Sequence, residues 1–143
     1  MGRKLLAIVT GMITALGIIW VTYMISTMMA PHYPKNLEYM GVAELQDYWA
    51  QVHASTYGVV VAGYVVAAFA AGFISTKMGR RWGGGYSLAI ICGALLTAWE
   101  IVSVFVWAQP SWFIIASVVL LIPMALVGYK FAHRWGHTHV LAT

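Results

Sequence analysis

The sequence predicts an all-α fold, a transmembrane four-helix bundle with a short interfacial helix between its first and second spans. Of its 143 residues, 62% are hydrophobic and 8% are charged, and the mean hydropathy is +0.80. Such a chain has too little polar surface to coat a water-soluble globule of this size. Four apolar runs of bilayer-spanning length follow one another along the chain, and short basic tracts flank them.

The first predicted span covers residues 5–29, which contain no charged side chain. As a helix this segment is about 37 Å long and exceeds the roughly 30 Å hydrocarbon core, so it can cross a bilayer with some tilt. It follows a basic start, and we interpret it as a retained signal-anchor. Its second half carries Trp20, Thr22 and Tyr23, a polar bias that favours contact with other helices over contact with lipid.

Residues 30–53 form the predicted extramembrane loop, in which Pro31 and Pro34 end the first helix. The loop holds three acids, Glu38, Glu44 and Asp47. Within it apolar residues recur at helical spacing, at Val42, Leu45, Trp49 and Val52. This pattern predicts either a short helix lying at the interface or an extension of the next span.

The second span, residues 54–76, is rich in small residues. They recur at intervals of four, which lets another backbone approach closely along two faces: Gly63, Ala67 and Ala71, and Ala68 and Gly72. The neighbour could belong to this chain or to another subunit, and we favour packing within the chain.

The third span covers residues 86–108 and the fourth covers residues 112–129. A basic, glycine-rich link precedes the third span, but it lacks the residue order of a phosphate-binding loop, so a flexible turn is favoured. Pro110 marks the turn before the fourth span, and Pro123 is expected to kink that span.

The charges predict the topology of a single membrane domain that covers residues 1–143. With the amino terminus inside, seven of the eight basic residues fall on the inner side, whereas the loop acids lie outside with Lys35. We therefore expect a multi-pass protein of the bacterial inner membrane with both termini in the cytoplasm, the tail 130–143 included.

Glu100 is the one acid or base predicted within the hydrocarbon region. A charged group there costs about 2.5 to 3.5 kcal/mol on insertion scales, so this side chain should point into the bundle and be neutral or partnered. Thr22, Tyr23 and Tyr57 lie at similar depth, and we predict that at least one of them donates a hydrogen bond to the carboxyl group. In one interpretation the cluster is a proton or cation site. In the other, Glu100 is a neutral acid that holds the helices together or contacts a polar residue of a partner subunit. We favour the second interpretation.

The histidines offer two further hypotheses. His53, at the outer mouth of the second span, could contact a haem or pigment, although a haem held between spans would need a facing second ligand that the sequence does not provide. His133, His137 and His139 could form a labile metal site, but a polar tail near the membrane explains them better. No cofactor or metal is predicted. Cys92 is the single cysteine, so an intramolecular disulfide is excluded.

Several features occur together: the basic start, the Pro31/Pro34 loop with its acids, a Gly/Ala-rich second span ending in Gly72 and Lys77, and then Gly93, Pro110-Ser111-Trp112 and Gly128. In this layout the chain resembles a family of small bacterial integral membrane proteins with four spans. The resemblance implies the same topology. The family has no established activity or catalytic residues to transfer.

For function, the leading expectation is an accessory or structural subunit that packs against a larger inner-membrane complex, such as an energy-transducing one. The alternative is a small oligomeric transporter or channel that uses Glu100 with Tyr57 and Tyr23. A third hypothesis is a protein that contacts a pigment or haem through His53. No nucleophile with an adjacent base, zinc-protease signature or dinucleotide fingerprint occurs, so we do not expect an enzyme. The expected partners are membrane lipids and other membrane subunits, and not nucleic acid.

Overall fold

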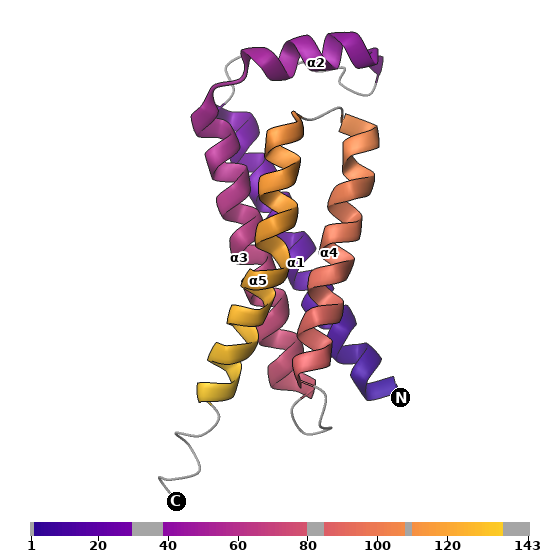
Figure 1. Ribbon diagram of the computed structural model, residues 1–143, viewed down its shortest axis with the longest axis vertical. Coiled ribbons are helices and arrows are strands. Elements are labelled where there is room, and N and C mark those ends of the chain that lie inside the picture. The colour runs from indigo at the N-terminus through magenta and orange to yellow at the C-terminus, as the bar shows by residue number, and fades with distance from the viewer. Residues whose placement is uncertain (1, 30–38, 80–84, 108–109, 136–143) are drawn as a thin grey trace, which may run out of the picture.

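The computed structural model describes residues 2–29, 39–79, 85–107 and 110–135. These residues form five helices, which are α1 (Gly2–Met29), α2 (Val42–Gln51), α3 (Ala54–Gly79), α4 (Gly85–Trp107) and α5 (Ser111–Trp135). The four long helices pack as a bundle, and α2 lies across one end of it (Figure 1). We call this end the α2 end, and the opposite end, where α1 begins and α5 ends, the basal end. The predicted fold class is confirmed.

The helices α1, α3, α4 and α5 are each long and apolar enough to cross a membrane. Each extends past its predicted apolar segment at the basal end: α1 begins at Gly2, α3 continues to Gly79, α4 begins at Gly85 and α5 continues to Trp135. In α1, α3 and α5 lysine and arginine side chains explain this difference, because their apolar stems can lie along a helix while their charges reach water. The apolar run therefore marks the membrane-embedded part of a helix and not its ends.

The short helix α2 is separate from the second span. Val52 follows α2 with extended backbone (φ −70°, ψ 130°), and α3 begins at Ala54. Leu45 is buried, and Trp49 and Val52 pack against the core, as the helical spacing predicts. Val42, which was predicted to share this buried face, does not, and its side chain is 65% exposed.

The helix α3 lies at the centre of the bundle and packs against α1, α4 and α5, whereas α1 and α4 touch each other much less. All five small residues predicted to pack are buried in α3. Gly72 lies against the backbone of Ala125 in α5, and Gly63 lies against the side chain of Thr22 in α1. The small residues thus bring both neighbours close to α3 within one chain.

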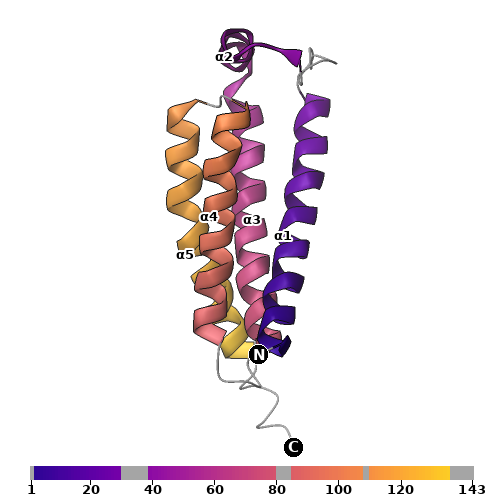
Figure 2. The same cartoon turned by 90° about the vertical axis from the view of Figure 1, so that its right-hand side faces the viewer.

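The described charges separate along the bundle axis. At the basal end lie the cations of α1, α3 and α5, which are Arg3, Lys4, Lys77, Lys130 and Arg134. The acids Glu44 and Asp47 belong to α2 at the other end. Arg80, Arg81, Lys35 and Glu38 also enter the predicted charge pattern and lie outside the described residues. The first turn of α1 and the last turn of α5 lie at the same end of the bundle, which is what a chain with four spans requires (Figures 1 and 2).

Candidate functional site: a buried acid beside an aromatic cavity

Glu100 lies inside the bundle, on the part of α4 that approaches the α2 end. Its side chain is 0% exposed, and neither carboxyl oxygen has a hydrogen-bond partner among the described residues. Buried polar groups in folded proteins are nearly always hydrogen-bonded, because leaving one unsatisfied costs about 1 to 3 kcal/mol. Glu100 is therefore an unusual buried group, because no hydrogen bond from a described residue offsets the cost of burying its carboxyl oxygens.

The predicted hydrogen bond from Thr22, Tyr23 or Tyr57 to Glu100 is wrong. The Thr22 hydroxyl donates to the carbonyl oxygen of Ile18 one turn earlier in α1 (2.8 Å), a local bond that threonine commonly makes within a helix. The Tyr57 hydroxyl donates to the carbonyl oxygen of Trp49 (2.8 Å). Trp49 lies in the last turn of α2, where carbonyl groups lack partners inside the helix, and its carbonyl oxygen also accepts from the backbone N–H of Val52 just after the helix (3.3 Å).

Tyr64 of α3 approaches the Glu100 carboxyl group instead, although the two groups do not form a hydrogen bond. Its side chain is 3% exposed, and its hydroxyl lies 2.9 Å from the hydroxyl of Tyr23 on α1. The two rings meet edge to face, with centroids 6.4 Å apart. Tyr64 was absent from the predicted cluster, yet it lies two helical turns after Tyr57 on the same buried face of α3. This spacing is the signal that could have identified it.

The hydrogen-bonded pair of Tyr64 and Tyr23 connects the surroundings of the Glu100 carboxyl group to helix α1. In a hydrogen bond between two hydroxyl groups, one hydroxyl donates its proton and the other keeps its own proton for another acceptor. Either Tyr23 or Tyr64 can be the donor. The direction of this bond decides whether the remaining proton lies on Tyr64, facing Glu100, or on Tyr23, on the other side of the pair.

Tyr23 also lines a cavity of about 710 Å³ at the α2 end. This volume lies within the range of about 300 to 1,000 Å³ that is usual for small-molecule sites. All five helices contribute an aromatic ring to its wall: Trp20, Trp49, Tyr57, Trp99 and Phe113. The polar side chains in the wall are neutral, and no charged residue appears among the described ones that line it.

The short helix α2 forms the roof of this cavity. Besides the hydrogen bond between Tyr57 and the Trp49 carbonyl, the rings of these two residues lie 6.1 Å apart. The Tyr57 ring also contacts Trp112 (5.2 Å) and Phe113 (5.5 Å) at the start of α5. Tyr57 therefore joins α2, α3 and α5 at one point, and it acts as the support of the roof instead of as a partner of Glu100.

One side of the cavity reaches the outer surface of the bundle. Trp20 on α1 and Trp99 on α4 line the cavity and are 66% and 52% exposed, respectively. The helices that carry them diverge toward the α2 end (Figure 2). In a bilayer this surface faces lipid, because α1 and α4 are both spans. The cavity is thus accessible from the side.

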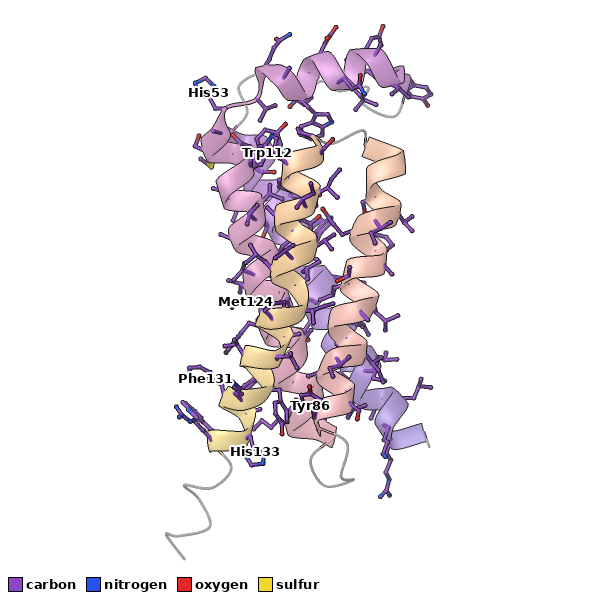
Figure 3. All side chains as sticks on the ribbon, in the orientation of Figure 1. His53, Tyr86, Trp112, Met124, Phe131 and His133 are labelled. Carbon is purple, nitrogen blue, oxygen red and sulfur yellow. The ribbon has the colours of Figure 1, made fainter. Side chains whose placement is uncertain are left out.

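The structure does not bring the described histidines together. His53 lies at the α2 end and is exposed, and His133 lies near the basal end of α5 (Figure 3). The His133 ring instead contacts the ring of Tyr129 (5.9 Å). Among the described residues, no three histidine, cysteine, aspartate or glutamate side chains are placed to hold a metal ion. His137 and His139 lie outside this part of the chain.

The fold and the buried acid together define a class: the chain is a multi-pass membrane protein with four candidate transmembrane helices. No family model, curated protein or solved structure matches the chain at a significant level. Function is therefore inferred from the site.

Proposed function

We propose that the protein is a small membrane transporter in which Glu100 takes up and releases a proton. The observation that carries the proposal is the connection from Glu100 to the cavity: the buried carboxyl group lacks a hydrogen-bond partner, Tyr64 approaches it, and Tyr64 is hydrogen-bonded to Tyr23 in the cavity wall. Ionisable groups inside membrane bundles commonly serve as proton or ion sites.

The geometry gives less support to a purely adhesive Glu100. An acid that holds helices together needs hydrogen bonds to them, and none is formed by the described residues. A side chain that is 0% exposed also cannot reach a residue of a partner subunit without rearrangement of the bundle. The first form lacks a hydrogen bond from Glu100 among the described residues, and the second requires the bundle to open.

The proposed setting is the bacterial inner membrane, with the basal end in the cytoplasm. The support is the separation of the described cations at the basal end from the acids of α2, which follows the positive-inside rule. It also agrees with the resemblance to small bacterial membrane proteins with four spans. In this orientation the cavity belongs to the outer half of the membrane.

Modification by dicyclohexylcarbodiimide tests the proposal, because this apolar reagent attacks protonated carboxyl groups in apolar surroundings. The purified full-length protein is treated over a range of pH, and the adducts are located by peptide mass mapping. We expect modification at Glu100 that falls as the pH rises, and little at the exposed Glu44 and Asp47. Glu100→Gln should remove the adduct.

A matched pair of tyrosine variants tests the connection. Tyr64→Phe should change the pH dependence of Glu100 modification, because a hydroxyl that approaches the carboxyl group is lost. Tyr86→Phe, at a tyrosine near the basal end of α4 whose ring contacts Tyr129 and does not line the cavity, should leave it unchanged. If Glu100 reacts only after denaturation, it is a sealed structural acid and the proposal is wrong.

An accessory subunit of a larger complex is the second candidate, and one observation favours it. Gly58 and Ala62 lie four residues apart on α3, both are exposed, and a Cβ atom at Gly58 would meet nothing within 4 Å. Such a surface can receive a helix of another protein. Native gels after mild detergent extraction distinguish the two candidates, because an accessory subunit migrates with a large complex and Gly58→Leu would release it.

A further inference from the structure

The wall of the cavity restricts the chemistry of what can bind there. Aromatic rings enclose it on several sides, and the hydroxyls of Ser26 and Ser103 already donate to carbonyl oxygens of their own helices. A strongly hydrated ligand such as a sugar would leave many of its polar groups unpaired in this environment. The occupant must therefore be largely apolar.

The charges around the cavity also discriminate by sign. The described basic residues of the spans lie at the basal end, away from the cavity, whereas Glu44 and Asp47 belong to the roof helix. Glu100 lies behind the tyrosine pair. An anion would meet no cation among the described lining residues. A cation would meet the faces of tryptophan and tyrosine rings, which attract positive charge, and an acid that can ionise.

We infer that the cavity binds a lipophilic cation, a quaternary or protonated amine or a phosphonium with apolar substituents, and that Glu100 releases its proton when the cation enters. The ligand class rests on the proposed function, because it assigns the substrate of the same acid. The O–H bond of the Glu100 carboxyl group breaks, and the proton leaves through Tyr64 and Tyr23 to water. The carboxylate that remains balances the charge of the bound cation.

The surroundings of Glu100 leave few other groups to titrate with it. Tyr64 comes from α3 and Tyr23 from α1, while α5 contributes the ring of Phe113 beside Tyr64. The titratable side chains of α5 lie in its last turns, from Tyr129 to Arg134. On α4 itself, Cys92 lies about 12 Å further toward the basal end. Exchange of a proton for a cation at this level is therefore assigned to Glu100.

The lateral opening suits such a ligand. Lipophilic cations concentrate in the bilayer near its surface, and the exposed rings of Trp20 and Trp99 border the cavity on the lipid-facing side. A ligand that arrives from the membrane can pass between α1 and α4 without displacing α2.

Three probes test the inference on the protein in detergent, of which the two ions have nearly equal shape and the neutral one is smaller. Tetraphenylphosphonium is a cation, tetraphenylborate is its anionic counterpart, and triphenylphosphine oxide is a neutral relative. Isothermal titration calorimetry in buffers of different ionisation enthalpy measures both binding and proton release. We expect tetraphenylphosphonium to bind at least about tenfold more tightly than either control and to release about one proton.

Two variants test the roles of Glu100 and of the cavity wall separately. Glu100→Gln should abolish proton release and weaken binding of the cation by about tenfold or more. Trp20→Leu should weaken binding and retain proton release. Equal binding of the cation and the anion by the unmodified protein would overturn the inference, and this result does not depend on how any variant folds.

The ligand class and the proposed function can fail separately. If the carbodiimide modifies Glu100 with the expected pH dependence but tetraphenylphosphonium does not bind, the inferred ligand is wrong and the proton site stands. If Glu100 does not react in the folded protein and no proton is released, the proposed function is wrong, and the inference falls with it.

Discussion

Gly72 of α3 lies directly against the main chain of Ala125 in α5, so that a Cβ atom built on Gly72 would overlap the Ala125 carbonyl group. Gly128, one turn later in α5, has the same relationship to the backbone of Phe69 and Phe73 in α3. The two helices therefore approach each other through backbone atoms, and neither contact can be relieved by rotating a side chain. The same two helices carry Phe113, which lines the cavity, and Tyr64, whose ring lies beside it (centroids 6.3 Å apart).

Gly72→Ala should destabilise the bundle, because the added methyl group has to displace the backbone of α5. Overpacking of this kind costs typically about 1 to 3 kcal/mol. Thermal unfolding in detergent should show a lower midpoint. Gly58→Ala is the matched control in the same helix, where a Cβ atom has open space, and it should be neutral or slightly stabilising, since alanine favours helix. Equal effects of the two substitutions would contradict the close contact.

Tyr57→Phe should loosen the roof without unfolding the bundle. The substitution removes the hydrogen bond to the Trp49 carbonyl, which contributes about 1 kcal/mol, and keeps most of the ring contacts. Hydrogen exchange of the α2 amides should become faster while exchange in the spans stays the same. Tyr86→Phe is the control, because the Tyr86 ring contacts Tyr129 near the basal end, far from α2. Unchanged protection of α2 in Tyr57→Phe would show that the roof is held by ring packing alone.

The fold could be predicted because the features that determine it are local in the sequence. A bilayer imposes a length and an apolar composition on each span, and Gly63, Ala67 and Ala71 recur at intervals that place them on one helix face. These signals need no knowledge of distant parts of the chain. The ends of the helices were less predictable, because Lys130 and Arg134 can lie on a helix that continues past the membrane.

The site was predicted only in part, because it depends on which hydroxyl faces which acceptor across the bundle. Thr22, Tyr23 and Tyr57 have the right depth for Glu100, but depth does not give direction, and two of them bond to backbone carbonyls instead. The spacing from Tyr57 places Tyr64 on the buried face of α3, but its approach to Glu100 appears only when α1, α3 and α4 are placed together. The cavity itself has no local signature, since every helix contributes to its wall.

Cysteines introduced at the two ends should be labelled on opposite faces of the membrane. Cys92 is 0% exposed, so the native protein should show little labelling by a membrane-impermeant maleimide. Ala50→Cys on α2 and Lys130→Cys on α5 each add a thiol at an exposed position. In intact bacterial cells whose outer membrane has been permeabilised, we expect labelling at position 50, and at position 130 only after lysis. The reverse pattern would invert the proposed topology and place the cavity in the inner half of the membrane.

Glu100→Met should preserve or increase stability while it removes proton release. Methionine has a similar length and fills the same space, and it removes two buried oxygens that no described residue satisfies. The free energy of unfolding should therefore stay level or rise by up to about 3 kcal/mol. Leu96→Met is the control, a buried position one turn away in α4 where a volume-conserving change costs less than about 1.5 kcal/mol. A bundle that is more stable without its acid retains that acid at a cost, as expected for a functional group. If Glu100→Met instead lost about 2 kcal/mol or more relative to Leu96→Met, the carboxyl group would be a structural contact and not the proton site.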